Sequence, residues 1–380
     1  MEFDIVGSEA IREGRATDAY FLRTEEALDH AGRNPHVVCD VTADQFGTGD
    51  WEVLAGLKDA VALFEGLDID VHALPEGTLF DGGPVMRIEG SYREFARYET
   101  SLLGFLSGAS AQATAALEAV TAAGDEASVL SFGARHVHPA ATAALERSAL
   151  VGGVSGFSHV AAGEVIDREP GGTMPHALVI SFGNGHQEDA WQAFDEAVAP
   201  EVPRVALVDT YTDEVDEAIR AAEAIDLDSV RLDTTGSRRG DFRHIAREVR
   251  WELDVRGHED VGIFVSGGLG PSEIRQLRDV VEGFGVGSYI SNADPVDFSL
   301  DIVEVESEPA AKRGKLSGTK QVYRTPDGGH AVALEGTAVE GEPLLEPVVE
   351  DGEVVGTFDL EAATERCAAD AARVGFGDGE

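Results

Sequence analysis

An alternation of apolar runs with helical patterns fills residues 128–292, and it constrains the fold more than any other feature. The segment after 204–210, for example, repeats apolar residues at helical spacing from Val215 to Ala222. Six such units in roughly 170 residues predict a parallel sheet, because parallel strands need long crossover connections. The expected strands are 128–133, 176–183, 204–210, 229–234, 261–268 and 285–292.

Polar side chains fall at or just after the ends of these apolar runs. The carboxyl ends of parallel strands meet at one edge, where barrels and doubly wound sheets both place their active sites. We therefore expect an irregular, TIM-like α/β barrel, with an open doubly wound sheet as the alternative. The strand-end residues are Arg135, Asp209, Arg231, Asp233, Ser266 and Ser288.

The segments on either side of this series have a different pattern. Residues 34–46 have strand character, 51–66 form a helical pattern, and 70–92 resemble paired strands around glycine turns. This predicts a second, α+β domain built from the N-terminal and C-terminal parts of the chain. The predicted division is an N-terminal α+β domain at 1–115, the barrel at 116–298, and a C-terminal segment at 299–380 that packs on the N-terminal domain.

The chain is strongly acidic, with 29 Lys and Arg against 71 Asp and Glu and a formal net charge of -42. Such a surface repels nucleic acid and anionic membranes, so neither is an expected partner. Self-repulsion on this scale also destabilises a compact state unless salt screens it. The composition therefore predicts a halophilic protein from a salt-rich cytoplasm.

The compartment and the metal content follow from simple counts. The two cysteines, Cys39 and Cys367, are far apart and in no metal-ligand spacing, which excludes a disulfide scaffold and a four-cysteine zinc site. The first ten residues, MEFDIVGSEA, have no basic region followed by an apolar core, and 18 apolar residues never run together. We expect a cytoplasmic protein with no membrane partner.

Two glycine-containing turns follow the last strands. Gly267 and Gly268 lie in VSGGLG, and Gly287 and Ser288 lie in GFGVGSYISN. Glycines let backbone N–H groups approach a phosphate closely, so the pair of turns predicts a phosphate site. Each turn taken alone is also explained as an ordinary connection.

Cationic side chains are scarce here, so their clusters are informative. Arg231, Asp233 and Arg238 lie within RLDTTGSRRGD, where the alternative to an anion site is a surface ion-pair cluster. Arg135 has His136 and His138 beside it. Its guanidinium could bind a ligand carboxylate or phosphate through two hydrogen bonds, or it could form an ion pair with a carboxylate of a nearby helix. The basic stretch with Lys312, Arg313 and Lys315 suggests a polyphosphate ligand.

His176 follows a Gly-Gly-Thr-Met-Pro turn that includes Thr173. A single histidine at a strand start is usually a satisfied core residue. Here the turn leaves N–H groups and a hydroxyl around the ring, which makes His176 a candidate nucleophile as well.

With these motifs in order, the sequence from about residue 10 to 325 resembles the nicotinate phosphoribosyltransferases of the archaeal branch. They are type II phosphoribosyltransferases related to the nicotinamide and quinolinate enzymes. The resemblance implies an irregular α/β barrel with a second domain, and head-to-tail homodimers, or higher oligomers, whose active sites are shared between subunits.

The resemblance also implies residue roles. His176 would be phosphorylated by ATP, and Arg231 with Asp233 would hold phosphoribosyl pyrophosphate. Ser158, at a position where amide-using relatives carry aspartate, favours an acid as substrate. The implied substrate-binding residues are Asp18, Tyr20 (both from the partner subunit), Phe132, Arg135, His138, Ser158 and Thr173, and the implied phosphate-binding residues are Arg238, Gly267, Gly268, Gly287, Ser288, Lys312, Arg313 and Lys315.

The function expected from the resemblance is ATP-coupled synthesis of nicotinate mononucleotide from nicotinate and phosphoribosyl pyrophosphate, in NAD biosynthesis. Mg²⁺ would accompany the pyrophosphate and ATP, and no structural zinc is expected, because the C-terminal region lacks the necessary cysteines. Nicotinamide and quinolinate remain alternative substrates, although two carboxylates ask for more cations than the stretch around Arg135 supplies. A catalytically inactive barrel that serves as a binding protein is the alternative from a different class.

Overall fold

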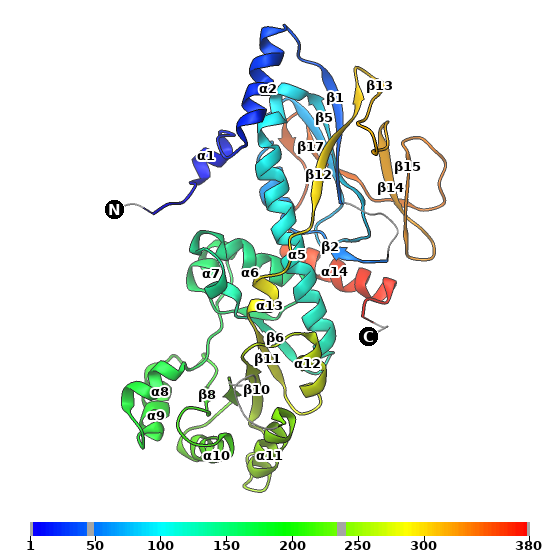
Figure 1. The fold of residues 1–380 in the computed structure, drawn as a ribbon. Coiled ribbons are helices and arrows are strands. Elements are labelled where there is room, and N and C mark those ends of the chain that lie inside the picture. Colours follow the sequence, from blue (N-terminus) through cyan, green and yellow to red (C-terminus); the bar gives the residue numbers. More distant parts are fainter. Residues whose placement is uncertain (1–2, 44–48, 234–240, 378–380) are drawn as a thin grey trace. The chain divides into compact units, whose positions relative to one another are not determined.

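The computed structural model describes residues 3–43, 49–233 and 241–377. The chain divides into two compact units, each with its own sheet (Figure 1). The first unit comprises Met1–Thr114 with Asp294–Glu380, and the second comprises Ala115–Ala293. The N-terminal and C-terminal parts of the chain therefore build one unit together.

The second unit is built on a six-stranded sheet whose neighbouring strands all run parallel, in the order β7-β6-β11-β10-β9-β8. Among the described strands, β7 and β8 stand at the two edges, so the sheet is open. The prediction of an α/β parallel sheet is confirmed. The strands are β6 (Ser128–Ser131), β7 (Gly156–Phe157), β8 (Val205–Leu207), β9 (Ser229–Leu232), β10 (Gly262–Ser266) and β11 (Gly283–Val286).

Helices connect these strands and cover the sheet. The helix α11 buries Ala246, Val249 and Leu253, which repeat at helical spacing, and Asp241 caps its first turn. The helices of this unit are α6 (Thr142–Val151), α7 (Val160–Ile166), α8 (His176–Phe182), α9 (Gln187–Ala197), α10 (Glu214–Ala224), α11 (Phe242–Asp254), α12 (Pro271–Leu277) and α13 (Ser288–Ser291), with short 3-10 turns at Gly133–His136 and Pro139–Ala141.

The predicted strand at 176–183 is wrong, because this segment forms the helix α8. Only Val179 is buried there, while Ile180 and Phe182 are 54% and 40% exposed, so the run does not lie inside a sheet. A short apolar run is compatible with either a strand or a helix. The predicted strand at 285–292 also ends early, since β11 stops at Val286 and α13 begins at Ser288.

The first unit contains a seven-stranded sheet in the order β13-β12-β1-β5-β3-β17-β18. Strand β12 lies antiparallel to β1, with Val305 opposite Val37 and Phe298 opposite Ala43, which joins the chain's two ends in one sheet. The strands are β1 (His36–Ala43), β3 (Ile69–Ala73), β5 (Gly83–Ser91), β12 (Phe298–Val305), β13 (Glu308–Pro309), β17 (Glu346–Glu350) and β18 (Glu353–Val354).

Smaller sheets and several helices complete this unit. The helix α5 (Glu99–Ala123) begins in the first unit and continues into the second. No helix within the described residues has both the length and the hydropathy needed to cross a bilayer. The remaining elements are β2 (Glu52–Val53) with β4 (Leu79–Phe80), β14 (Lys320–Arg324) with β15 (His330–Leu334) and β16 (Glu342–Pro343), and the helices α1 (Ser8–Arg12), α2 (Ala19–His30), α3 (Leu57–Val61), α4 (Tyr92–Phe95), the 3-10 turn Ala96–Tyr98 and α14 (Leu360–Val374).

Candidate active site

A cavity of about 740 Å³ opens at the carboxyl ends of the parallel strands in the second unit. Residues that directly follow β6, β9 and β11 meet there, which is the arrangement that parallel sheets use for binding. The lining residues are Phe132, Ala134, Arg135, His136, Ser158, His159, Gly171, Gly172, Thr173, Pro175, Arg231, Asp233, Ser266, Gly267, Gly268, Gly285, Gly287 and Ser288.

Arg231 extends from β9 into this cavity. Its guanidinium donates to the Thr173 hydroxyl and lies 6.0 Å from the centre of the Phe132 ring. Burial lowers the pKa of Arg231, although the carboxylates of Asp233 and Asp209 oppose that shift. A desolvated guanidinium held in this way is suited to binding an anionic ligand group.

Two aspartates and a histidine form a connected cluster beside Arg231. The Asp209 carboxylate accepts from His176 Nε2 at 2.9 Å and from the Asp233 backbone N–H at 2.8 Å. The Asp233 side chain accepts from the Ser266 hydroxyl and lies 3.7 Å from His176 Nδ1. The Asp209 side chain is fully buried, whereas those of His176 and Asp233 are about a third exposed. Asp209 therefore holds both Asp233, which lines the cavity, and His176, which is not among the lining residues.

Glycines shape the floor of the cavity. A Cβ on Gly285 would lie 2.4 Å from Cε2 of Phe132, so only glycine lets this ring lie across β11. Gly267 and Gly268 have φ values of 99° and 73°, a left-handed region that favours glycine. Gly267 and Gly268 therefore present backbone to the cavity without side chains.

The turns after β6 and β7 bring further nitrogen-bearing side chains to the cavity. Arg135 and His136 come from the turn after β6, and His159 comes from the turn after β7. Nδ1 of His159 accepts from the Ala162 backbone N–H at 3.1 Å, so its neutral ring carries the proton on Nε2. Among the described lining residues, Asp233 is the only acid.

Several predicted site residues lie elsewhere. His138 does not line the cavity; its Nδ1 accepts from the Ala140 N–H in an exposed turn. Asp18 and Tyr20 begin α2 in the first unit, where the Tyr20 hydroxyl donates to Asp18 at 3.5 Å. Arg238 lies outside the described residues.

The basic segment at 312–315 also belongs to the first unit. Lys312 and Lys315 lie 2.6 and 3.1 Å from the buried Asp301 carboxylate, and Arg313 is exposed. Burial would raise the pKa of Asp301, but hydrogen bonds from the two lysines and Ser299 outweigh it and lower the pKa. Part of the positive charge assigned to a polyphosphate ligand is thus engaged within the chain.

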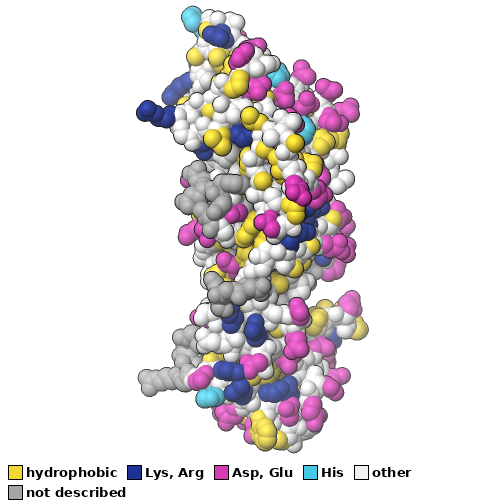
Figure 2. All heavy atoms as spheres, turned by 90° about the vertical axis from the view of Figure 1, so that its right-hand side faces the viewer, with side chains coloured by type: hydrophobic (Ala, Val, Ile, Leu, Met, Phe, Trp, Pro, Cys, Tyr) yellow, Lys and Arg dark blue, Asp and Glu magenta, His cyan; other side chains and the backbone are white. Residues whose placement is uncertain are grey.

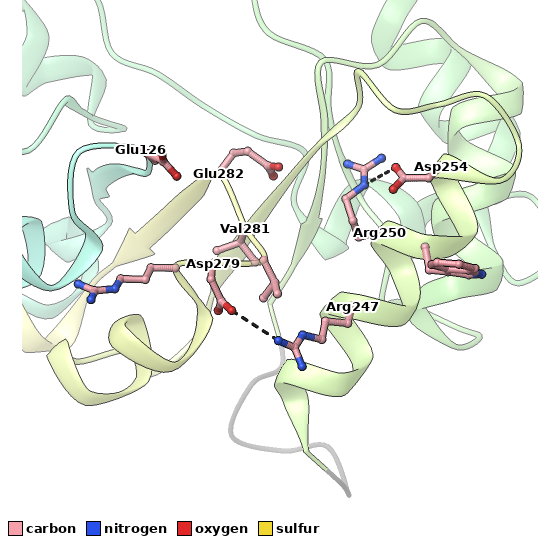
Figure 3. A pocket seen from close by; sticks show the side chains of 10 residues that line it. Glu126, Arg247, Arg250, Asp254, Asp279, Val281 and Glu282 are labelled. Carbon is pink, nitrogen blue, oxygen red and sulfur yellow. Dashed lines mark hydrogen bonds and ion pairs between the residues drawn. The ribbon is translucent and has the colours of Figure 1, made fainter.

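A second cavity of about 500 Å³ lies near the amino ends of β6 and β11, beside α11 (Figure 3). Two of its arginines point toward acidic groups: Arg250 lies 2.7 Å from Asp254, and Arg247 lies 3.5 Å from Asp279. No group of three or more His, Cys, Asp or Glu that could hold a metal occurs among the described residues. The first cavity is the better candidate active site.

Sequence reasoning missed His159 and the function of Asp209. His159 follows β7, whose two residues are too few to show a periodic pattern. Asp209 was placed at a strand end, but its bonds to His176 and to the Asp233 N–H join residues 33 and 24 positions apart, respectively. Only the folded chain brings such segments together.

These features define a site for an anionic ligand at the carboxyl ends of a parallel sheet, and the comparisons give the family. Residues 18–110 match the N-terminal domain of quinolinate phosphoribosyl transferase, and residues 112–301 match its C-terminal domain. The chain belongs to the quinolinate phosphoribosyl transferase family. That family's fold, an α/β curled parallel half-barrel with a separate N-terminal domain, agrees with the predicted fold class.

Three known proteins illustrate the similarity. A nicotinate-nucleotide pyrophosphorylase from Pyrococcus furiosus superposes with a TM-score of 0.94 and 47% identity over 99% of both chains. Human nicotinic acid phosphoribosyltransferase shares the fold, with a TM-score of 0.74 and 19% identity over 94% of both chains. A nicotinate phosphoribosyltransferase of Mycobacterium tuberculosis is 32% identical over 74% of this chain, which spans only 62% of that relative.

The expected function is corrected by these findings. ATP-coupled synthesis through a phosphorylated His176 is contradicted, because the matching family models are those of quinolinate phosphoribosyl transferase and the Pyrococcus furiosus structure is a nicotinate-nucleotide pyrophosphorylase. Quinolinate was disfavoured because the stretch around Arg135 carries few cations, but the fold adds the Arg231 guanidinium and the His159 ring from other parts of the chain.

Proposed function

We propose that the chain transfers phosphoribose from phosphoribosyl pyrophosphate to quinolinate, with loss of CO₂, and so makes nicotinate mononucleotide for NAD biosynthesis. The observation that carries the proposal is the 47% identity to the Pyrococcus furiosus pyrophosphorylase over 99% of both chains. The two family models, which together run from residue 18 to 301, support the same chemistry.

The cationic cavity suits a pyridine with two carboxylates. Arg135 has no ion-pair partner within the described residues, so its fork remains available for one carboxylate. His159 presents an N–H for the second carboxylate, and Phe132 offers a ring face for the pyridine. Ser158 adds a hydroxyl where a carboxylate would repel the substrate.

The sugar and its phosphates fit the opposite side of the cavity. The loops at Gly267–Gly268 and Gly287–Ser288 would receive the 5′-phosphate through backbone N–H groups. Arg231 would neutralise charge on the departing pyrophosphate, and Asp233 would orient the ribose. Since Asp233 is the only acid lining the cavity in the described chain, Mg²⁺ would be held mainly by the pyrophosphate itself.

The proposed reaction needs no ATP. The quinolinate nitrogen attacks C1 of the ribose while the bond from C1 to the pyrophosphate oxygen breaks. The bond between C2 and its carboxylate then breaks and CO₂ departs. The electron pair stays on C2, where the adjacent positive nitrogen stabilises it, and a proton from water adds to it. Loss of CO₂ makes the reaction irreversible. A homodimer in which Asp18 and Tyr20 reach the partner's cavity would complete the site.

The test combines purified protein, phosphoribosyl pyrophosphate, Mg²⁺ and quinolinate labelled in the C2 carboxylate, without ATP. Labelled CO₂ and nicotinate mononucleotide should form in equal amounts. Asp233→Asn should lower both. If labelled CO₂ is not released while another pyridine carboxylate is turned over, the decarboxylating assignment fails; if no pyridine is turned over, the transferase assignment fails as well.

A further inference from the structure

A buried carboxylate supports the loop that follows the cluster of His176, Asp209 and Asp233. Glu217, on α10, accepts from the backbone N–H groups of Thr210 at 2.9 Å, Tyr211 at 2.7 Å and Thr212 at 2.9 Å. These three residues come directly after Asp209. One side chain therefore holds the whole backbone of this short turn, which we name the 210–212 loop.

Glu217 is built into the interior. It is 0% exposed, and the side chain of Gln187 on α9, which is 1% exposed, donates to Glu217 Oε1 at 3.4 Å. Burial of a carboxylate costs free energy unless hydrogen bonds compensate, and here backbone amides supply most of them. A residue that served only to fill space here could be nonpolar, so the hydrogen bonds of Glu217 indicate a further role.

Capping of α10 does not explain this residue. Asp213 is the N-cap, and its Oδ1 accepts from the Asp216 N–H at 3.0 Å. Glu217 lies one turn further along, and its side chain reaches back past the N-cap to the loop residues that precede α10. Its hydrogen bonds hold the 210–212 loop, and the loop in turn holds Asp209, which directly precedes it.

We propose that Glu217 is a positioning residue that fixes Asp209, and through Asp209 both His176 and Asp233, for phosphoribosyl transfer. The inference rests on the proposed function, because that function gives Asp233 a ribose to orient. Asp209 has no side-chain exposure and binds both groups directly, so a shift of the 210–212 loop is passed to them. Displacement by about 1 Å can reduce a rate about 100-fold.

The main variant is Glu217→Gln, which keeps the size but replaces one acceptor oxygen by a donor. In either orientation of the amide, at least one loop N–H then faces another N–H group. Hydrogen exchange of the amides at 210–212 should accelerate, kcat should fall about 10- to 100-fold, and KM should change less than about threefold. Glu223→Gln, at an exposed position of the same helix, is the matched control and should change neither.

A double-mutant cycle separates positioning from general destabilisation. If Glu217 acts through Asp209, the rate losses of Glu217→Gln and Asp209→Asn should not add. Additive losses, or a normal rate with fast loop exchange, would overturn the inference. If Glu217→Gln does not fold, Glu217→Asp replaces it, since aspartate keeps the charge but is one methylene shorter. This variant should show faster exchange at 210–212 and a lower kcat, both to a smaller degree. Unchanged exchange and kcat would refute the inference. An inactive wild-type protein would overturn the proposed function, while the exchange measurement would still test the loop contact.

Discussion

Gly285→Ala is the sharpest test of how the pyridine side of the cavity is built. The added Cβ would lie 2.4 and 2.6 Å from Cε2 and Cδ2 of Phe132, and 3.1 Å from Cβ of Ser266. Ordinary contact begins near 3.4 Å, so the Phe132 ring or β11 must move by about 1 Å. The backbone of Gly285 is not in the left-handed region, so an alanine there adds no backbone strain and any effect comes from the steric clash.

Overpacking of this kind costs about 1–3 kcal/mol. For a unit of this size, each kcal/mol lowers Tm by about 2–4 °C, so the expected loss is roughly 2–12 °C. A 1 Å displacement of the ring should also raise KM for the pyridine about 10- to 100-fold, because ring contact and cation–π geometry both depend on it. KM for phosphoribosyl pyrophosphate should change much less.

The assay is initial-rate kinetics with each substrate varied in turn, together with a thermal melt. Gly104→Ala serves as the control, because a Cβ there meets nothing within 4 Å and the residue lies on the helix α5. It should leave both KM values unchanged and raise Tm slightly. A lowered Tm with an unchanged pyridine KM would show that Phe132 does not form the pyridine face, and no effect on either quantity would refute the packing argument itself.

Other outcomes follow from charge and burial. Arg135→Ala should raise KM for quinolinate roughly 10- to 100-fold in the kinetic assay, because a hydrogen bond to a charged group contributes about 1.5–3 kcal/mol; an unchanged KM would place the carboxylates elsewhere. Burial raises the pKa of Glu146 to about 7, against the opposing effect of the Ser131 hydroxyl. The folded state therefore binds this proton more tightly, and its contribution of about 3 kcal/mol is present below pH 4.5 and lost as the pH rises through 7. Glu146→Gln should accordingly raise Tm at pH 8 and leave it nearly unchanged at pH 4.5, and equal shifts at both pH values would contradict this. The net charge of -42 predicts that urea-unfolding midpoints rise with KCl from dilute buffer to molar salt, and Figure 2 shows acidic side chains scattered over one face of the molecule; equal midpoints would oppose the prediction of a halophilic protein.

Much of the site could be predicted because each residue follows its own strand. Phe132, Arg231, Asp233 and Ser288 come at the ends of apolar runs, and parallel strands bring such ends to one edge whatever the details of packing. The glycines of the two loops were found for the same reason. These signals are local, so a single sequence carries them.

The substrate assignment was less accessible. The prediction considered only the cations near Arg135 in the sequence. The ligand in a binding site also meets side chains from distant segments, and here the Arg231 guanidinium and the His159 ring line the same cavity. The assignment of ATP coupling came from a resemblance and not from the residues, and the family models correct it.

The sequence by itself determined the α/β class, the acidic surface and the edge of the sheet at which chemistry would occur, because these depend on periodicity and composition. Tertiary structure alone decided that 176–183 is a helix and that Asp209 binds both His176 and Asp233. It also decided that Glu217 holds the 210–212 loop. Those outcomes depend on which distant segments meet, and the energy of a buried hydrogen bond is set by its partner in space rather than by its neighbours in the chain.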